Sequence, residues 1–423
     1  MRRNRANWNN EKLKDITTKI GSGATPRGGQ GAYHQEGMPL IRSKNIYDLN
    51  FSYDDLAFIN DSQAEQLDNV SVEKDDVLLN ITGASVCRCT SVPDCLVPAR
   101  VNQHVAIIRA DRKNLDGKYL KYTLVSPLYK RALMGLATTG ATREALTKND
   151  IENFELKLPG IKAQTRIASV LSAYDDLIEN NEKRIKILEE MAQLLYSEWF
   201  VRFNFPGHEK VKMVDGGTQY GMIPEGWNIR KLWDVVGFLE GPGLRNWQYR
   251  DSGIPFLNIR TIGDGDIDID ECNYLDIEEV ERKYSHFLLK ENDIVISSSG
   301  TLGRLATIRK KHLPLCLNTS VIRFREIKDG LPIWFVRQYL LSPLFQNKIR
   351  SLASGSAQLN YGSSHLSTIS IVMPKANILD EYNRKASCVE EYINNIRGHI
   401  AVLRKIRDML IPQLVTGKRE LKY

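Results

Sequence analysis

Two long stretches of the chain carry apolar residues at heptad spacing. The first covers residues 161–200, contains no Gly or Pro, and is rich in residues that favour helix. Its a and d positions are Leu171, Tyr174, Ile178, Asn181, Ile185, Leu188, Ala192 and Leu195. A second stretch, residues 378–411, repeats the pattern at Val389, Ile393, Ile396, Ile400, Leu403 and Leu410. Such narrow apolar seams predict two long helices that pair as a coiled coil.

The two helices belong to a longer internal repeat. Tyr174 and Val389 lie 215 residues apart, and Trp8 and Trp227, which open the similar blocks WNNEKLKDI and WNIRKLWDV, lie 219 apart. Two further blocks of the first copy resemble blocks of the second copy: KDDVLLNITGASVCR resembles ENDIVISSSGTLGRL, and PARVNQHVAIIR resembles PLCLNTSVIRFR. A nearly constant offset over several blocks indicates a duplication.

Each copy of the repeat has the pattern of a globular domain followed by a long helix. We expect a first globular domain at residues 1–160, a helix at 161–205, a second domain at 206–375 and a helix at 376–423, with residues 207–227 as a loop leading into the second domain. Short apolar strands at 77–81, 105–109, 294–297 and 320–324 accompany helical patterns at 117–137 and 331–352. The predicted class is α+β, with two tandem mixed α/β domains separated by two long helices. Because the second domain connects the end of one helix to the start of the other, we expect an antiparallel coiled coil.

Composition limits the setting of the protein. No run of eighteen apolar residues occurs, so we expect no membrane span. The first residues, MRRNRANWNNEK, lack the apolar core of a secretory signal, and six cysteines in 423 residues do not form a disulfide framework. These features predict a cytoplasmic protein. The net charge of +7 suits a polyanionic partner.

Motifs for catalysis or cofactor binding are missing from the sequence. We find no Walker A loop, no G-x-G-x-x-G after a strand, no H-E-x-x-H and no Asn-Pro-Pro-aromatic motif. A nuclease-like Glu155-x-Lys157 lies far downstream of its nearest Pro-Asp pair, Pro93-Asp94. Cys87, Cys89, Cys95 and His104 have atypical zinc spacing and no counterpart in the second copy. The sequence therefore predicts no catalytic site, no cofactor and no metal.

Polar loops after predicted strands are the candidate DNA contacts. Small hydroxyl residues beside Gly let backbone N–H groups approach phosphate, and a nearby Arg pairs with phosphate or guanine. The same residues also cap strands and satisfy loop backbone, so both roles stay open. In the first copy the candidates are Arg42, Lys44, Asn45, Thr82, Ser85, Arg88, Asn102, Gln103, His104, Thr139 and Arg143. In the second copy they are Asn258, Arg260, Ser298, Ser299, Arg304, Asn318, Thr319, Ser356 and Gln358.

Several segments resemble a known family. They are LEEMAQLLYSEWFVRFNFPG, GMIPEGW and LRKIRDMLIPQLVTGKREL, together with LNITGASV and VNQHVAII in the first domain. Over essentially its whole length the chain resembles the specificity subunit of type I DNA restriction-modification enzymes. The resemblance implies that each globular part is a target recognition domain that reads one half of a bipartite site in double-stranded DNA. It also implies that the helices are a spacer and a platform for two modification subunits, which carry the adenine N6-methyltransferase chemistry, and that motor-nuclease subunits complete the complex.

The chain departs from a strict repeat at one loop. The second copy has Asn318-Thr319-Ser320 where the first has Asn-Gln-His, so a base contact shared at this position is not expected. Two alternatives remain beside the specificity subunit: a stand-alone DNA-modifying enzyme, and a stand-alone DNA-binding or coiled-coil scaffold protein. The missing cofactor motifs count against the enzyme. Footprinting on bipartite sites would separate a DNA reader from a scaffold.

Overall fold

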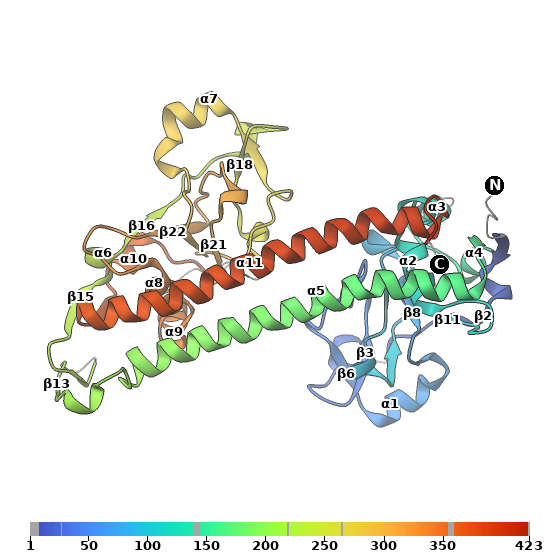
Figure 1. Cartoon of the computed structure of the whole chain (residues 1–423), viewed down its shortest axis with the longest axis horizontal. Helices are drawn as coiled ribbons and strands as arrows, with labels where there is room; N and C mark the ends of the chain where they lie inside the picture. Colours follow the sequence, from blue (N-terminus) through green and yellow to red (C-terminus); the bar gives the residue numbers. More distant parts are fainter. Residues whose placement is uncertain are drawn as a thin grey trace. The chain divides into compact units, whose positions relative to one another are not determined.

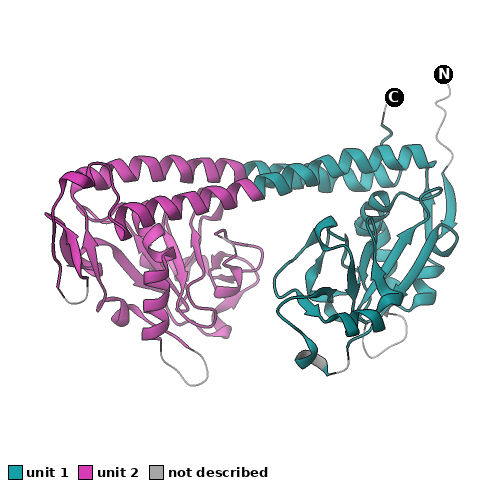
Figure 2. Cartoon of the chain, turned by 90° about the horizontal axis from the view of Figure 1, so that it is seen from below, with its two compact units in different colours: residues 1–182, 398–423 teal, residues 183–397 magenta. Residues whose placement is uncertain are grey.

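The chain forms two compact units. The computed structural model describes residues 8–26, 28–138, 144–217, 220–263, 265–353 and 359–421, so the candidates Thr139, Arg143, Ser356 and Gln358 lie outside the described residues. Unit 1 consists of residues 1–182 and 398–423, and unit 2 of residues 183–397 (Figure 2). Each unit thus combines one globular part with a section of both long helices. The domain boundaries predicted above remain a division based on sequence.

A four-stranded antiparallel sheet forms the centre of unit 1. Its order is β2 (Thr17–Ser22), β11 (Val105–Ala110), β8 (Val77–Asn80) and β9 (Cys89–Ser91). Leu79 and Ile108 pack in one core with α2 (Gly117–Val125) and α3 (Pro127–Thr138), whereas Leu78 and Ile107 pack in another core with the second sheet. Successive side chains of a strand point to opposite faces, so this sheet is buried on both sides.

The second sheet of unit 1 has the order β6 (Ala57–Ile59), β3 (Met38–Ile41), β10 (Ala99–Val101) and β7 (Ser71–Val72). Strands β3 and β10 run parallel, so their carboxyl ends meet. The remaining elements are the pairs β1 (Asn9–Lys12) with β12 (Glu155–Leu158) and β4 (Ile46–Tyr47) with β5 (Asn50–Phe51), and the helices α1 (Asp61–Gln66) and α4 (Lys148–Glu152).

Unit 2 repeats the central sheet. Its order is β16 (Gly237–Glu240), β22 (Val321–Arg325), β20 (Ile294–Ser297) and β21 (Leu305–Thr307), with α8 (Ile333–Leu341) and α9 (Pro343–Leu352) in the core against it. A smaller sheet has the order β17 (Tyr249–Arg250), β19 (Asn273–Leu275) and β18 (Ile254–Phe256). The other elements are β13 (Met213–Asp215), β14 (Met222–Pro224), β15 (Asn228–Lys231), β23 (Ser370–Met373), α6 (Leu232–Val235), α7 (Ile277–Glu279) and α10 (Ser363–Leu366).

An ion pair is conserved between the two central sheets. Arg109 of β11 lies 2.8 Å from the buried Asp76, and Arg325 of β22 lies 2.5 Å from the buried Asp293. Asp76 lies in the turn just before β8, and Asp293 lies in the turn just before β20, the equivalent strand of the second sheet. The shared strand order and the shared ion pair show that the duplication seen in the sequence is also a duplication of fold.

The two long helices are α5 (Ile161–Tyr196) and α11 (Ala376–Val415) (Figure 1). In unit 1, Asp175 binds Arg407 at 2.8 Å and Glu182 binds Arg404 at 2.5 Å, so residue numbers rise along α5 as they fall along α11. The helices are therefore antiparallel, as predicted. The predicted a and d residues are all buried or half-buried, which confirms the seam.

Several expectations about element boundaries were wrong. Helix α5 ends at Tyr196 in a π-turn, and α11 ends at Val415 before the left-handed Gly417, so both helices are shorter than predicted. The helical pattern at 117–137 is broken at Ser126, because the residue before Pro127 is disfavoured in the helical region. The pattern at 331–352 is broken at Ser342 in the same way. The predicted loop at 207–227 contains the hairpin of β13 and β14.

Within the described residues, no helix is both long enough and apolar enough to cross a membrane.

Candidate nucleic-acid interface

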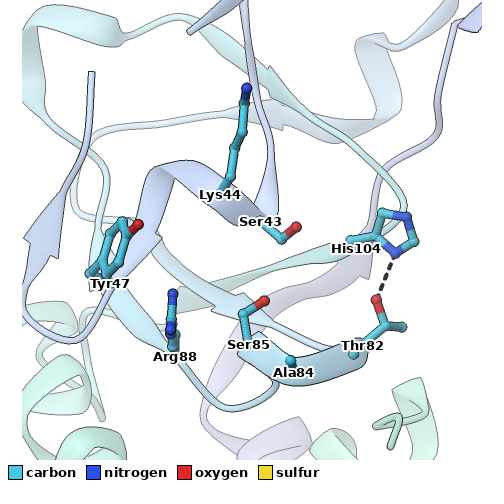
Figure 3. Close-up of a pocket in the computed structure, with 9 residues that line it drawn as sticks. Ser43, Lys44, Tyr47, Thr82, Ala84, Ser85, Arg88 and His104 are labelled. Carbon is cyan, nitrogen blue, oxygen red and sulfur yellow. Dashed lines mark hydrogen bonds between the residues drawn. The ribbon is translucent and has the colours of Figure 1, made fainter. Parts of the chain in front are cut away.

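An open hollow of about 460 Å³ lies at one end of the central sheet of unit 1 (Figure 3). It is lined by Ser43, Lys44, Tyr47, Thr82, Gly83, Ala84, Ser85, Arg88 and His104. Five of these residues, Lys44, Thr82, Ser85, Arg88 and His104, are candidates from the sequence. The structure therefore brings together polar loops that are separated by up to sixty residues in the chain.

Strand pairing explains why these loops meet. The last residue of β8, Asn80, faces the first residue of β11, Val105, so the loop after β8 lies beside the loop before β11. The parallel pairing of β3 with β10 brings the segment after β3 to the same place, where the N–H of Asn102 donates to the carbonyl of Ile41 at 3.1 Å. Three loops thus converge at one end of the sheets.

Two cations face the hollow. The guanidinium of Arg88 lies over the ring of Tyr47, 4.7 Å from its centroid, and Figure 3 shows the two side chains adjacent at one side of the hollow. A guanidinium stacked on an aromatic face keeps its edge free for bidentate hydrogen bonding. Lys44 is held by Asp55 at 2.8 Å, in an ion pair that is exposed to solvent. This side of the hollow is suited to phosphate or to the acceptor edge of guanine.

A chain of hydrogen bonds runs into the opposite side of the hollow. The hydroxyl of Thr82 lies 2.6 Å from Nδ1 of His104, and Nε2 of His104 lies 3.0 Å from the amide nitrogen of Gln103. The hydroxyl of Thr25 donates to the amide oxygen of Gln103. Gly83, next to Thr82, has φ +72°, which favours glycine, and no atom lies within 4 Å of the position that a Cβ would occupy, so the turn leaves room for a ligand's backbone.

Some candidates support the loops rather than face the hollow. Asn45 is fully buried; its side chain accepts from the N–H of Arg42 at 3.0 Å and donates to two backbone carbonyls. Asn102 is also buried, and its side-chain oxygen accepts from the N–H of His104 at 3.1 Å. Arg42 donates to the carbonyl of Asp55 and lies over the ring of Tyr33. Of the two roles left open by the sequence, loop support is therefore the one seen for these three.

Unit 2 carries the corresponding loops with different side chains. The N–H of Asn80 donates to the carbonyl of Arg88 at 2.9 Å, and the N–H of Ser297 donates to the carbonyl of Arg304 at 2.8 Å. Arg88 and Arg304 are therefore equivalent, and their one-residue offset arises because the second loop is one residue shorter. The Arg304 side chain is exposed.

The other candidates of unit 2 divide between exposed and supporting positions. Arg260 and Thr319 are exposed, Ser299 is half-buried and Ser298 is buried. Asn318 accepts from the N–H of Ser320 at 2.9 Å, which matches the bond made by Asn102. Asn258 caps the short helix η10 (Ile259–Thr261) by accepting from the N–H of Arg260.

The zinc-like cysteine set and the nuclease-like Glu155-x-Lys157 gain no support from the residues that the structure describes. No cluster of three or more His, Cys, Asp or Glu side chains suited to a metal ion occurs there. Cys87 is buried, and burial raises the pKa of its thiol to about 11, which disfavours the thiolate that zinc binds. Glu155 and Lys157 lie on the exposed face of β12, while Asp94 is paired with Lys74 at 2.7 Å.

The sequence interpretation missed Ser43, Tyr47 and Thr25. Tyr47 stands among basic and polar residues, and aromatic residues interleaved with cations are a known signal of nucleic-acid contact. Thr25 carried no such signal, because its contact with Gln103 joins residues 78 apart in the chain.

Comparison with known proteins identifies the family. The family model for the type I restriction modification DNA specificity domain matches residues 5–190 and again residues 224–397. The chain belongs to this family. One match falls on each copy of the repeat, in agreement with the duplicated fold.

Individual relatives are similar over nearly the whole chain. The type I restriction enzyme MjaIX specificity subunit of Methanocaldococcus jannaschii is 25% identical over 97% of this chain and 93% of its own length. The EcoKI specificity subunit of Escherichia coli K12 is 22% identical over 86% of this chain and 79% of its own length. The crystal structure of a type I restriction-modification S subunit from M. genitalium superposes with a TM-score of 0.55 at 16% identity, covering 98% of this chain and 97% of that one. That likeness concerns the fold.

Proposed function

We propose that this chain is the DNA-specificity subunit of a type I restriction-modification complex. It binds double-stranded DNA at a bipartite site, and each globular part, residues 1–160 and 206–375, acts as the target recognition domain for one half. The observation that carries the proposal is the double match of the family model, once on each copy of the repeat. Two related readers in one chain are suited to two separated half-sites.

The hollow in unit 1 supports DNA as the ligand of the first reader. It combines the cations Lys44 and Arg88 with the hydroxyl groups of Ser43, Thr82 and Ser85. Cations and hydroxyls position a protein on phosphates, and a bidentate arginine reads guanine. In the second reader the exposed Arg260, Arg304 and Thr319 are the proposed contacts. Asn45, Asn102, Asn258 and Asn318 are proposed to hold these loops in place.

The helices are proposed to bind two copies of one protein partner. Outside the coiled-coil seam, unit 2 exposes Ile187, Met191 and Leu194 at helical spacing i, i+4, i+7, which lies on one face of α5. Unit 1 exposes Val402, Ile406 and Met409 at the same spacing on α11. We call these the apolar stripes. A coiled coil needs apolar residues only at its seam, so a second stripe indicates a further protein contact.

The two stripes are copies of one another. Each residue of the α11 stripe follows its α5 counterpart by 215 residues, the offset of the repeat. The same offset relates two further exposed apolar residues, Leu177 on α5 and Tyr392 on α11. Equivalent surfaces suit two copies of the same protein, which agrees with two methyltransferase subunits per specificity subunit.

Catalysis is proposed to reside in the partner subunits. The methyltransferase subunits supply adenine N6 methylation, and motor-nuclease subunits supply ATP-dependent cleavage, in the cytoplasm. This chain then contributes binding and assembly, which require neither cofactor nor metal.

Exchange of one reader tests the proposal. Residues 206–375 would be replaced by the equivalent region of a relative, and the chain would be expressed with its own methyltransferase subunit. Methylome sequencing should then show one half of the methylated sequence changed and the other half retained. Change in both halves would contradict separate readers. Footprinting of the unmodified complex on the site so found should protect both halves, whereas a scaffold protein that does not bind DNA would protect neither.

A further inference from the structure

The hydrogen-bond chain beside the hollow has a direction fixed by its first members. The amide nitrogen of Gln103 can only donate, and it faces Nε2 of His104 at 3.0 Å. Nε2 must therefore accept, which places the proton of the neutral imidazole on Nδ1. Nδ1 then donates to the hydroxyl oxygen of Thr82 at 2.6 Å.

This order leaves the hydroxyl proton of Thr82 available. The oxygen of Thr82 already accepts from His104, so its own O–H donates elsewhere. Thr82 lines the hollow, and Figure 3 shows the Thr82–His104 pair on the side of the hollow away from Tyr47 and Arg88. Gln103 is exposed and does not line the hollow; its amide contacts the imidazole of His104 and accepts from the hydroxyl of Thr25.

We propose that Thr82 is a hydrogen-bond donor to one base of the first half-site, and that Gln103, acting through His104, is the positioning residue that fixes its direction. This inference rests on the proposed DNA-reading function of unit 1. The acceptors that a donor selects in the major groove are purine N7, guanine O6 and thymine O4. An amino group of adenine or cytosine can be accepted only by the one remaining lone pair of the Thr82 oxygen, with the O–H turned away from the base, so these bases are disfavoured.

A base is favoured over a phosphate as the acceptor. Lys44 and Arg88 already bring positive charge to the hollow, whereas a neutral hydroxyl adds little attraction to phosphate. What a fixed hydroxyl adds is discrimination between acceptors and donors. This arrangement occurs in the first reader and not at the equivalent position of the second, because unit 2 has Ser320 in place of His104 and so has no imidazole there to donate a hydrogen bond.

The test uses the full chain and a duplex library in which the first half-site is randomised and the second is held constant. Thr82→Val removes the hydroxyl and keeps the shape of the side chain. It should reduce discrimination at one base pair by about 5- to 150-fold, the range of a single mismatched pair. Gln103→Leu should reduce discrimination at the same base pair. The double variant should lose no more than either single variant, because both changes interrupt one chain of hydrogen bonds.

Controls separate the possible outcomes. Thr18→Val makes the same chemical change at an exposed position of β2 outside the hollow, and should leave every preference unchanged. A second library, in which the first half-site is held constant and the second is randomised, checks folding: a retained preference for the second half-site in each variant shows that the protein is folded. Preferences within twofold of wild type in Thr82→Val would overturn the inference, as would additive losses in the double variant. Equal weakening on all sequences would make Thr82 a phosphate contact and equally overturn it. A wild-type chain with no sequence preference would instead refute the proposed function.

Discussion

Neutralising equivalent buried carboxylates in the two units should change the free energy of unfolding differently: a loss of stability in unit 1, and no loss in unit 2. In unit 1, Asp175 of α5 binds Lys121 at 2.9 Å, Tyr122 at 2.5 Å and Arg407 at 2.8 Å, and its side chain is only 18% exposed. Burial alone would raise the pKa of this carboxyl, but Lys121 and the hydrogen bonds from Tyr122, Lys121 and Arg407 outweigh burial and hold the pKa below its usual value. Asp175→Asn leaves two buried cations facing an amide, and we expect it to cost about 3 kcal/mol, the lower end for breaking a buried ion pair.

The counterpart in unit 2 is Glu390 of α11, opposite Arg337. The two charged groups lie 2.8 Å apart, but Oε1 of Glu390 and Nη1 of Arg337 make no hydrogen bond, because the N–H is not directed at the oxygen. Burial raises the pKa of Glu390, and the attraction of Arg337 does not offset it. Ionised Glu390 is thus costly at neutral pH. We expect Glu390→Gln to be neutral or slightly stabilising, because Arg337 keeps a second carboxylate partner, Glu189, at 3.4 Å.

Peptide-resolved hydrogen exchange of the full chain measures both effects, because amides report the opening free energy of their own region. Amides of α2 should exchange about 100-fold faster in Asp175→Asn, since 1.4 kcal/mol is a factor of ten. Those of α8 should be unchanged or slower in Glu390→Gln. An equal loss of protection in both variants would refute the argument from hydrogen-bond geometry.

The pH dependence of the two variants has opposite signs. A carboxyl whose folded pKa is lowered, as for Asp175, stabilises the fold above its unfolded pKa of about 3.9 and loses that contribution as pH falls through the folded value. A carboxyl whose folded pKa is raised, as for Glu390, stabilises the fold when protonated, below about pH 4.3, and loses that contribution as pH rises. The penalty of Asp175→Asn should therefore shrink on acidification, and the benefit of Glu390→Gln should grow as pH rises above 4.3.

Three further predictions concern function. If Arg88 contacts phosphate, Arg88→Ala should weaken binding to all sequences and reduce the slope of log affinity against log salt concentration by about one. If Arg88 contacts guanine, the substitution should cost about 1–3 kcal/mol of binding free energy at one base pair. Binding measured over a series of salt concentrations distinguishes the two. Met191→Asp and Ile406→Asp each place a charge in one apolar stripe, and native mass spectrometry should show one methyltransferase copy lost from each and two from the pair. Inserting one heptad after Glu182 and one after Arg397, at the boundary between the units, lengthens each helix by about 10 Å and preserves the seam. The methylated site should then keep both half-sequences with a spacer one to three base pairs longer, and an unchanged spacer would show that the helices do not set it.

The features that the sequence predicted well are local or periodic. The seam of α5 and α11, the central strands and the duplication are all visible as spacing along the chain. What the sequence did not reveal depends on pairing between distant segments. The parallel contact of β3 with β10 places the buried Asn102 beside Ile41. A separate bond from the N–H of Leu49 to the carbonyl of Cys89 joins the segments that carry Tyr47 and Arg88, and no local pattern encodes either contact. The breaks at Ser126 and Ser342 were readable, because each precedes a proline.

Comparison of the two copies shows that the loop before β11 and the loop before β22 share one conserved turn but differ in the side chains that follow it. Asn102 and Asn318 make the same hydrogen bond to the N–H two residues ahead, so the turn is built identically in both units. The residues that follow them differ: Gln103 and His104 in one copy, Thr319 and Ser320 in the other. Because the turn depends on the asparagine and not on its neighbours, those neighbours can change without loss of fold. In the proposed function this arrangement lets a single scaffold read two different half-sites, and it lets either half-site change while the other is kept.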